Sequence, residues 1–166
     1  FLGCFVNLYF KIYLIMKIYI GTDHAGFETK EVLLSFLHEL GYEVEDKGAY
    51  YFDALDDYPD FIYPVAEAVA RDPESRGIIL GGSGQGEAIC ANRVRGVRAA
   101  VYYGGPIDIV VLSREHNDAN VLSLGARFID TDEAKKVTRI WLETQFGGVE
   151  RHAQRIAKID KVAESN

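Results

Sequence analysis

Cysteine and positive charge are both scarce in this sequence of 166 residues. The two cysteines, Cys4 and Cys90, fit no zinc-ligand or redox spacing. We expect Cys90 to be a small buried residue on a helix, and a reducing, cytoplasmic location is the simplest interpretation. Eighteen Lys and Arg against 25 Asp and Glu give a net charge of −7. This balance argues against nucleic acid or an anionic membrane as the main partner, and a phosphate site would need a local basic cluster.

Long apolar runs are also missing. The most apolar stretch, residues 1–15, contains one charge, Lys11, and is shorter than the roughly 20 residues that cross a bilayer. It has neither a basic start nor a small-residue cleavage site, so we do not expect a signal peptide. We interpret residues 1–15 as a non-native or upstream extension, with an extra strand or an apolar arm on a partner subunit as the alternative. Residues 16–166 suit one globular domain.

Short apolar runs alternate with helical patterns from residue 17 onward. Strands are predicted over residues 17–21, 42–46, 77–80, 97–102 and 121–124. Helices are predicted over residues 28–40, 61–70, 87–92, 107–114, 130–144 and 150–163. This alternation predicts a parallel sheet covered by helices on both faces, an α/β fold. In such sheets ligands bind beyond the carboxyl ends of the strands, at a switch point.

Four glycines crowd the segment Gly81-Gly82-Ser83-Gly84-Gln85-Gly86-Glu87, which directly follows the third predicted strand. Glycines let the backbone turn sharply and expose its N–H groups. At the start of a helix those groups can hold an anion or a developing negative charge. Glu87 falls in the first turn of the predicted helix. The strand, the glycine loop and the carboxylate together predict the catalytic site.

Three better-known loops do not fit this segment. A P-loop would end in Gly-Lys-Ser/Thr, and no lysine is present. The dinucleotide fingerprint would place a glycine at position 87 and an acidic residue about 20 positions further on, and both are missing. A serine-hydrolase elbow around Ser83 would need a glycine at position 85, which is Gln.

Two other polar segments are candidates for proton transfer or binding. Asp23 and His24 follow the first predicted strand in a glycine-containing turn, although Asp23 could simply cap the next helix. His116 lies in the polar run of residues 114–120, between a helix and a buried strand. A histidine there is suited to proton transfer near neutral pH, whereas a solvated loop is the alternative.

Arg151 and Arg155 are four residues apart near the start of the last predicted helix, so they share one face. Basic residues at this end oppose the helix dipole, which favours an anionic ligand held by both guanidinium groups. The alternative is that they pair with Glu150 or Asp160. Arg127, just past the last strand, could join them. No histidine–carboxylate spacing indicates a metal, and we expect neither a metal nor a cofactor.

Six motifs share one register from Met16 to about Val162. They are Gly21-Thr22-Asp23-His24-Ala25-Gly26, Asp57-Tyr58-Pro59-Asp60, the glycine loop with Glu87, Ala91-Asn92-Arg93, Arg114-Glu115-His116-Asn117-Asp118-Ala119-Asn120 and Arg151-His152-x-x-Arg155. Together they resemble the type B ribose-5-phosphate isomerases, which belong with the galactose-6-phosphate isomerase subunits in one sugar-phosphate isomerase family. Residues 1–15 are not covered by the resemblance.

The resemblance implies a three-layer, Rossmann-like α/β/α fold. It also implies a homodimer or a dimer of dimers, with each active site shared between two subunits. The implied reaction is a metal-free aldose–ketose isomerisation through an enediolate. Such a reaction needs a positioned base and donors aimed at the developing oxyanion.

The resemblance further implies a role for each matching residue. Glu87 would move the proton between C1 and C2. The enediolate oxygens would be held by Ser83 and by the loop of Gly82, Gly84 and Gly86. Ring opening would be assisted by Asp23 and His116, and Asn117 would contact the sugar. The phosphate would be held by His24, Arg127, Arg151 and Arg155.

Position 81 departs from part of that family. Some members carry a cysteine base there together with an apolar residue at the position of Glu87. This chain has Gly81 and Glu87 instead, so Glu87 is the only base that the loop can offer. Cys90 lies further along the helix and is not that thiol.

Two alternatives to a ribose 5-phosphate isomerase stay open from the sequence. The same chemistry could act on a six-carbon sugar phosphate, such as galactose 6-phosphate or allose 6-phosphate. Residues 48–57 and 102–107 would decide between the two substrates, and they do not reveal the sugar length. The second alternative is a non-catalytic module that binds a nucleotide or a flavin, against which the missing fingerprints count.

Overall fold

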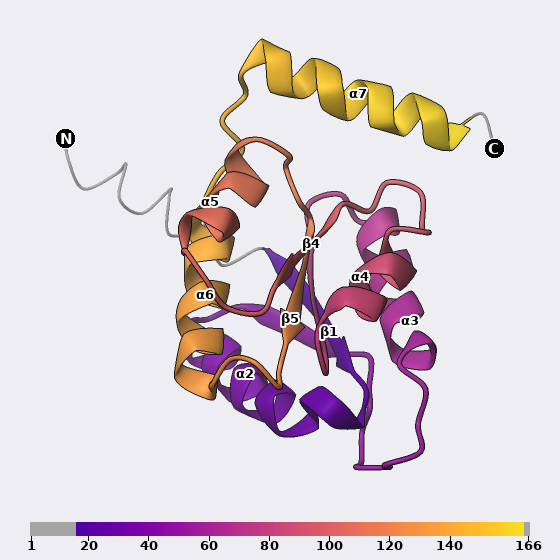
Figure 1. Ribbon diagram of the computed structural model, residues 1–166, viewed down its shortest axis with the longest axis vertical. Helices are drawn as coiled ribbons and strands as arrows, with labels where there is room; N and C mark the ends of the chain where they lie inside the picture. The colour runs from indigo at the N-terminus through magenta and orange to yellow at the C-terminus, as the bar shows by residue number, and fades with distance from the viewer. Residues whose placement is uncertain (1–15, 165–166) are drawn as a thin grey trace.

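A five-stranded parallel sheet forms the centre of the computed structural model, which describes residues 16–164 (Figure 1). The strands are β1 (Lys17–Thr22), β2 (Glu43–Asp46), β3 (Arg76–Gly81), β4 (Ala99–Tyr102) and β5 (Val121–Gly125). They pair in the order β2-β1-β3-β5-β4, and every pairing is parallel. The predicted parallel sheet is therefore confirmed. The expected extension, residues 1–15, lies outside the described residues.

Helices cover both faces of this sheet. They are η1 (His24–Gly26), α2 (Phe27–Glu39), α3 (Pro59–Arg71), α4 (Gln85–Ala91), α5 (Asp108–Glu115), α6 (Thr131–Glu143) and α7 (Glu150–Glu164). One face is covered by α2, α5 and α6, and the other by α3 and α4 (Figure 1). This is the three-layer α/β/α arrangement that was expected. Between residues 16 and 164, no helix has the length and apolar character needed to cross a membrane.

The sheet divides the apolar core into two clusters. Successive side chains of a strand point to opposite faces. Ile78 and Leu80 of β3 therefore pack in the cluster that contains Trp141, whereas Ile79 packs in the cluster that contains Ile62. All five side chains are fully buried. Because β3 is covered on both sides, its run is apolar throughout, and its end fixes the position of the glycine loop.

Some element boundaries differ from the prediction, each for a local reason. The fourth strand begins at Ala99, because the side chain of Asn120 accepts the N–H of Arg98 at 2.8 Å and Val97 lies in a turn. α3 begins at Pro59, two residues earlier than predicted. Proline is favoured at that first position, where its missing N–H would have had no helical partner.

Cys90 is only half-buried on α4, so the expectation of a buried core residue is wrong. The buried positions of α4 are Glu87, Ala88 and Ala91. Cys90 lies beside this stripe, because a helix advances about 100° per residue and one face cannot bury every position.

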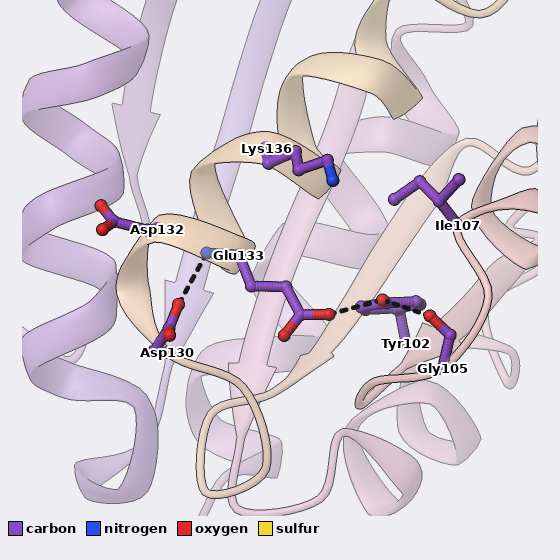
Figure 2. A pocket seen from close by; sticks show the side chains of 7 residues that line it. All are labelled: Tyr102, Gly105, Ile107, Asp130, Asp132, Glu133 and Lys136. Atoms are coloured by element: carbon purple, nitrogen blue, oxygen red, sulfur yellow. Dashed lines mark hydrogen bonds between the residues drawn. The ribbon is translucent and has the colours of Figure 1, made fainter.

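α6 begins as the sequence predicted, with Asp130 accepting the N–H of Glu133 at 2.8 Å. The reciprocal half of the capping box is not formed among the described residues. The Glu133 carboxylate turns instead toward Tyr102 and accepts its hydroxyl at 2.7 Å (Figure 2). The same hydroxyl lies 3.0 Å from the carbonyl oxygen of Gly105. Burial, and then the neighbouring Glu133, raises the pKa of Tyr102 to about 12.

α7 stands apart from the sheet. Figure 1 shows it beyond the amino ends of the strands, reached through residues 144–149. The N–H of Gly147 donates to the carbonyl of Glu115 at 3.1 Å, and the rings of His116 and His152 lie 4.1 Å apart. These contacts attach the start of α7 to the end of α5.

Candidate active site

The switch point of the sheet lies between β1 and β3. These strands are neighbours, but the helix after β1 packs on one face and the helix after β3 packs on the other. The chain segments that leave their carboxyl ends therefore diverge, and this is the place where such sheets bind ligands. Asp23 and His24 follow β1, and the glycine loop follows β3. The predicted site residues of these two segments thus meet at one place.

The glycine loop is held against the end of β5. Ser123 donates its hydroxyl to the carbonyl of Gly84 at 2.6 Å, and the N–H of Arg127 donates to the carbonyl of Gly82 at 3.1 Å. Gly84 has φ +75°, a left-handed conformation that glycine adopts without strain. Ser83 accepts the N–H of Gln85 at 3.4 Å. The loop is therefore a fixed turn that ends where α4 begins.

The Glu87 carboxylate lies over the backbone of Gly81. Any Cβ at position 81 would overlap Oε1 and Cδ of Glu87, so only glycine leaves room for this side chain. Glu87 is 4% exposed, and its Oε2 is buried with no hydrogen-bond partner in the described structure. Burial, more than the nearby charge of Asp23, raises the pKa of Glu87 above its ordinary value. The backbone N–H groups of Glu87 and Gly84 oppose that rise.

Asp23 is the second buried carboxylate of the site. It accepts the N–H of Ala25 at 2.9 Å, so the capping role considered from the sequence is real. Asp23 is also 6% exposed. Burial raises its pKa, the N–H of Ala25 lowers it, and the charge of Asp56 raises it further. Two buried carboxyl groups with raised pKa values, Asp23 and Glu87, therefore lie near each other at the switch point, an arrangement typical of acid–base sites.

His24 has a partner that the sequence did not indicate. Its Nδ1 lies 2.7 Å from Oδ1 of Asp56, which also accepts the backbone N–H of His24 at 3.0 Å. Asp56 comes from the loop between β2 and α3, 32 residues away, so no local spacing could have revealed it. Ligand atoms of Asp23, His24 and Asp56 lie within 4.8 Å of one another, a geometry open to a metal ion. In this structure His24 is hydrogen-bonded to Asp56, and its Nδ1 lies 3.9 Å from Oδ2 of Asp23.

Arg127 lies beside the glycine loop. A Cβ at Gly82 would lie 3.3 Å from Nη1 of Arg127, so the exposed guanidinium runs along that glycine. On the other side of the loop, a Cβ at Gly86 would lie 3.0 Å from the ring of Tyr58. Tyr58 belongs to one of the motifs behind the resemblance, which assigned it no role, and here its ring packs against the start of α4.

The remaining predicted residues lie at the opposite edge of the sheet. His116 and Asn117 follow α5, which runs back from the carboxyl end of β4 to the amino ends of the strands. Arg151 and Arg155 are exposed on α7, beyond the same amino edge. Within the described residues neither arginine forms an ion pair with Glu150 or Asp160, so that alternative is not realised. One chain does not bring these four residues to Glu87.

A hollow of about 470 Å³ opens at the carboxyl end of β4, where Figure 2 shows the Tyr102–Glu133 hydrogen bond at its centre. Its lining residues are Tyr102, Gly105, Ile107, Asp130, Asp132, Glu133 and Lys136. Three of them fall in the segment 102–107 that the sequence left open as a determinant of sugar length. None of the predicted catalytic residues lines it.

Fold and site together define the class of the protein. It is an α/β enzyme whose candidate site, with two buried carboxyl groups and a glycine loop, lies at the switch point of a parallel sheet. The model of the Ribose/Galactose Isomerase family matches residues 18–159. The chain belongs to this family and is, like its relatives, an isomerase. The resemblance stated from the motifs is confirmed, and the alternative of a non-catalytic module is not supported.

Individual relatives agree with this assignment. Ribose-5-phosphate isomerase B of Mycolicibacterium paratuberculosis is 40% identical over 141 residues, which are 85% of this chain and 87% of the relative. The solved structure of ribose-5-phosphate isomerase B from Clostridium thermocellum is similar with a TM-score of 0.84 and 44% identity, covering 90% of this chain and 99% of that one. For the enzyme from Mycoplasma genitalium with bound ribulose-5-phosphate, the TM-score is 0.87 and the identity 37%, covering 92% and 99%.

Proposed function

We propose that this protein interconverts D-ribose 5-phosphate and D-ribulose 5-phosphate. The observation that carries the proposal is the Glu87 carboxylate, which is buried at the switch point with one oxygen unpartnered and its pKa raised. A base whose pKa approaches the working pH transfers protons most effectively. The ribulose-5-phosphate bound to the relative from Mycoplasma genitalium supports a five-carbon substrate.

Glu87 acts as the base of an enediolate mechanism. After the sugar ring opens, the carboxylate takes the proton from C2 of the aldose, and the electron pair of that C–H bond forms the C1–C2 double bond while O1 becomes negative. Glu87 then returns a proton to C1. A proton passes from O2 to O1, which leaves the ketose carbonyl at C2. Asp23 and His116 assist the ring opening that precedes these steps.

Ser83 and the N–H groups of the glycine loop hold the enediolate oxygens. Such donors act where charge develops, and removal of one typically costs about 3–4 kcal/mol of transition-state stabilisation. The phosphate is held by His24, Arg127, Arg151 and Arg155, and Asn117 contacts the sugar. Binding energy from this remote phosphate fixes the sugar against Glu87.

Each active site is completed by a second subunit, in a homodimer or a dimer of dimers. His116, Asn117, Arg151 and Arg155 lie at the amino edge of the sheet, whereas Glu87 lies at the carboxyl edge. A neighbouring copy can deliver its amino edge to the carboxyl edge of this one. The two exposed arginines, without an ion pair to Glu150 or Asp160, are then available to the partner's substrate.

Isotope exchange tests the reaction directly. Incubation with ribose 5-phosphate in D2O is expected to place deuterium at C2 of the recovered aldose, because the abstracted proton exchanges with solvent. A protein that converts the sugar without any such exchange would contradict the enediolate. The family description names galactose as well as ribose, so kcat/KM for galactose 6-phosphate and allose 6-phosphate should be measured in parallel.

Glu87→Gln is expected to lower kcat by about 10²–10⁴-fold, the usual contribution of a general base. The amide keeps the size of the side chain but cannot accept a proton from carbon. The measurement is steady-state turnover, with phosphate binding as the control for an intact site. Turnover at the wild-type rate would exclude Glu87 as the base.

We also propose a reducing, cytoplasmic location, which rests on the low cysteine content of the sequence. Cys90 is a free thiol in the described structure. Fractionation of cells with an antibody against the protein tests the location.

A further inference from the structure

Asp56 is the inward-facing carboxylate of an otherwise exposed loop. Its side chain is 8% exposed, whereas the neighbouring Leu55 is 90% exposed. Oδ1 of Asp56 accepts two donors from one residue, the backbone N–H of His24 at 3.0 Å and Nδ1 of the same residue at 2.7 Å. Phe52 of the same loop places its ring edge-on to the His24 imidazole, with the centroids 6.3 Å apart. The loop therefore holds His24 on two sides.

We propose that Asp56 is a positioning residue that holds Nδ1 of His24 as a hydrogen-bond donor and so directs Nε2 toward the anionic end of the substrate. This inference rests on the proposed function, in which His24 holds the phosphate. The hydrogen bond made by one ring nitrogen of a histidine decides the state of the other. A carboxylate can only accept, so Nδ1 must be the donor in the 2.7 Å contact, and Nε2 is the ring nitrogen left for a ligand.

Two carboxyl groups lie on the Nδ1 side of the ring and leave Nε2 on the other side. Asp56 lies 2.7 Å and Asp23 lies 3.9 Å from Nδ1 of His24. When Nε2 also carries a proton, it can donate to a phosphate oxygen while Nδ1 still donates to Asp56. Asp56 thus supplies the counter-charge for the form of His24 that an anion requires.

The second oxygen of Asp56 argues against a purely structural role. Oδ2 is buried and has no hydrogen-bond partner in the described structure. Burial of a carboxylate oxygen without a donor costs stability, and a neutral side chain could close the same loop without that penalty. The charge of Asp56 is therefore explained by its effect on His24.

The ring state of His24 can be read by NMR without any substrate. In protein labelled with ¹⁵N, long-range proton–nitrogen spectra distinguish the two nitrogens, and His24→Gln identifies the His24 signals. We expect a protonated Nδ1 in the wild type. In Asp56→Ala the proton should move toward Nε2, whereas Asp56→Asn, whose amide oxygen still accepts, should keep Nδ1 protonated.

Inorganic phosphate is the binding probe, followed in the same spectra. Asp56→Ala and Asp56→Asn are both expected to weaken phosphate binding by about tenfold, because both remove the counter-charge. Asp53→Asn is the matched control: it removes one charge from the same loop, and asparagine can keep the bond that Asp53 makes to the N–H of Leu55 at 3.0 Å. We expect wild-type binding from this control.

Kinetics separate positioning from catalysis. Asp56→Ala should raise KM for ribose 5-phosphate by about tenfold and leave kcat within about twofold, because the phosphate is remote from the reacting carbons. A wild-type His24 whose Nδ1 carries no proton, or an unchanged ring state and phosphate affinity in Asp56→Ala, overturns the inference. Failure of the wild type to turn over ribose 5-phosphate would contradict the proposed function alone, because the protonation of the His24 ring is measured without substrate.

Discussion

The carboxyl group of Glu87 occupies the space at the end of β3 that a side chain at position 81 would need. A Cβ at position 81 would overlap the carboxyl group of Glu87, while both backbones are fixed by a strand and a helix. The sequence resemblance implied a base either at position 81 or at position 87. In this chain, a side chain at position 81 and the carboxyl group of Glu87 could not both be accommodated. Gly81 is required by the side chain beside it, since the φ angle of Gly81 is not in the left-handed region.

Gly81→Ala is expected to displace the Glu87 carboxylate and lower kcat to nearly the level of Glu87→Gln. Because both changes remove the same base, the double variant should lose little more than either single variant. The measurement is a double-mutant cycle on kcat/KM. Losses that multiply in the double variant would show that Gly81 acts independently of Glu87.

Glu87 is also expected to reduce stability at neutral pH. Its pKa is higher in the folded protein than its ordinary value of 4.5, so the folded state prefers the protonated carboxyl. The stability that comes from this preference is present below pH 4.5 and is lost as the pH rises through the raised pKa.

Glu87→Gln, which is neutral at every pH, should therefore have a higher Tm than the wild type at pH 8, with the difference shrinking toward pH 4. At a pH above both pKa values, each unit by which folding raises the pKa of Glu87 lowers the free energy of unfolding by about 1.4 kcal/mol. Thermal unfolding across this pH range measures the effect. A difference in Tm that grows toward acid pH would contradict the burial of a charged Glu87.

Individual residues of the candidate site could be predicted only where their position relative to a strand was enough to place them. Asp23 directly follows β1, and Glu87 follows β3 after the glycine loop. Because the carboxyl ends of parallel strands meet at one edge, their proximity was predictable. The role of Asp56 could not be predicted, because its contact with His24 spans 32 residues and depends on how the loop after β2 folds back. Long-range contacts of this kind leave no local spacing to read.

At the scale of elements, a buried arginine joins α5 to the chain that leads into α7. Nη1 of Arg114 lies 2.8 Å from Oδ1 of Asp118 and 2.6 Å from the carbonyl oxygen of Ala119, and Nε donates to the carbonyl of Thr144 at 3.2 Å. The guanidinium also lies over the ring of Trp141, 5.7 Å from its centroid. Arg114 thus fixes the turn after α5, which carries His116, to the end of α6.

Arg114→Met is expected to destabilise the protein by about 2–3 kcal/mol, because it leaves buried carbonyl groups without a donor. Arg71→Met is the matched control: Arg71 is exposed and pairs with Glu67 on the surface of α3, at 3.3 Å, so about 0.5 kcal/mol or less is expected. Denaturant unfolding measures both. Equal losses in the two variants would refute a structural role for the Arg114 contacts.

The elements themselves were predictable because β3 and β5 are short apolar runs and the helices carry regular apolar stripes. Their ends were less so. The fourth strand begins later than predicted because the side chain of Asn120, 22 residues away, accepts the N–H of Arg98. The Glu133 carboxylate accepts the hydroxyl of Tyr102, 31 residues away, instead of completing the capping box. In both cases a tertiary hydrogen bond replaces the local one that the sequence suggested.

At the scale of the whole molecule, the sheet separates the two groups of candidate residues. A helix that follows a parallel strand returns the chain to the amino edge, so residues just after α5 and α6 lie there, opposite the residues that just follow strands. His116, Arg151 and Arg155 belong to the first group, and Asp23 and Glu87 to the second. If both groups serve one reaction, the partner subunit must supply one of them.

Mixing two inactive variants tests this arrangement. In Glu87→Gln every site lacks its base, and in the double variant Arg151→Ala/Arg155→Ala every site lacks the two arginines. After subunit exchange in an equal mixture, about half of the dimers are mixed, and each mixed dimer holds one site with wild-type residues from both chains. About a quarter of wild-type activity should then return, whereas sites built within one chain would give no recovery, because no chain in the mixture is complete. Each variant incubated alone under the same exchange conditions is the control.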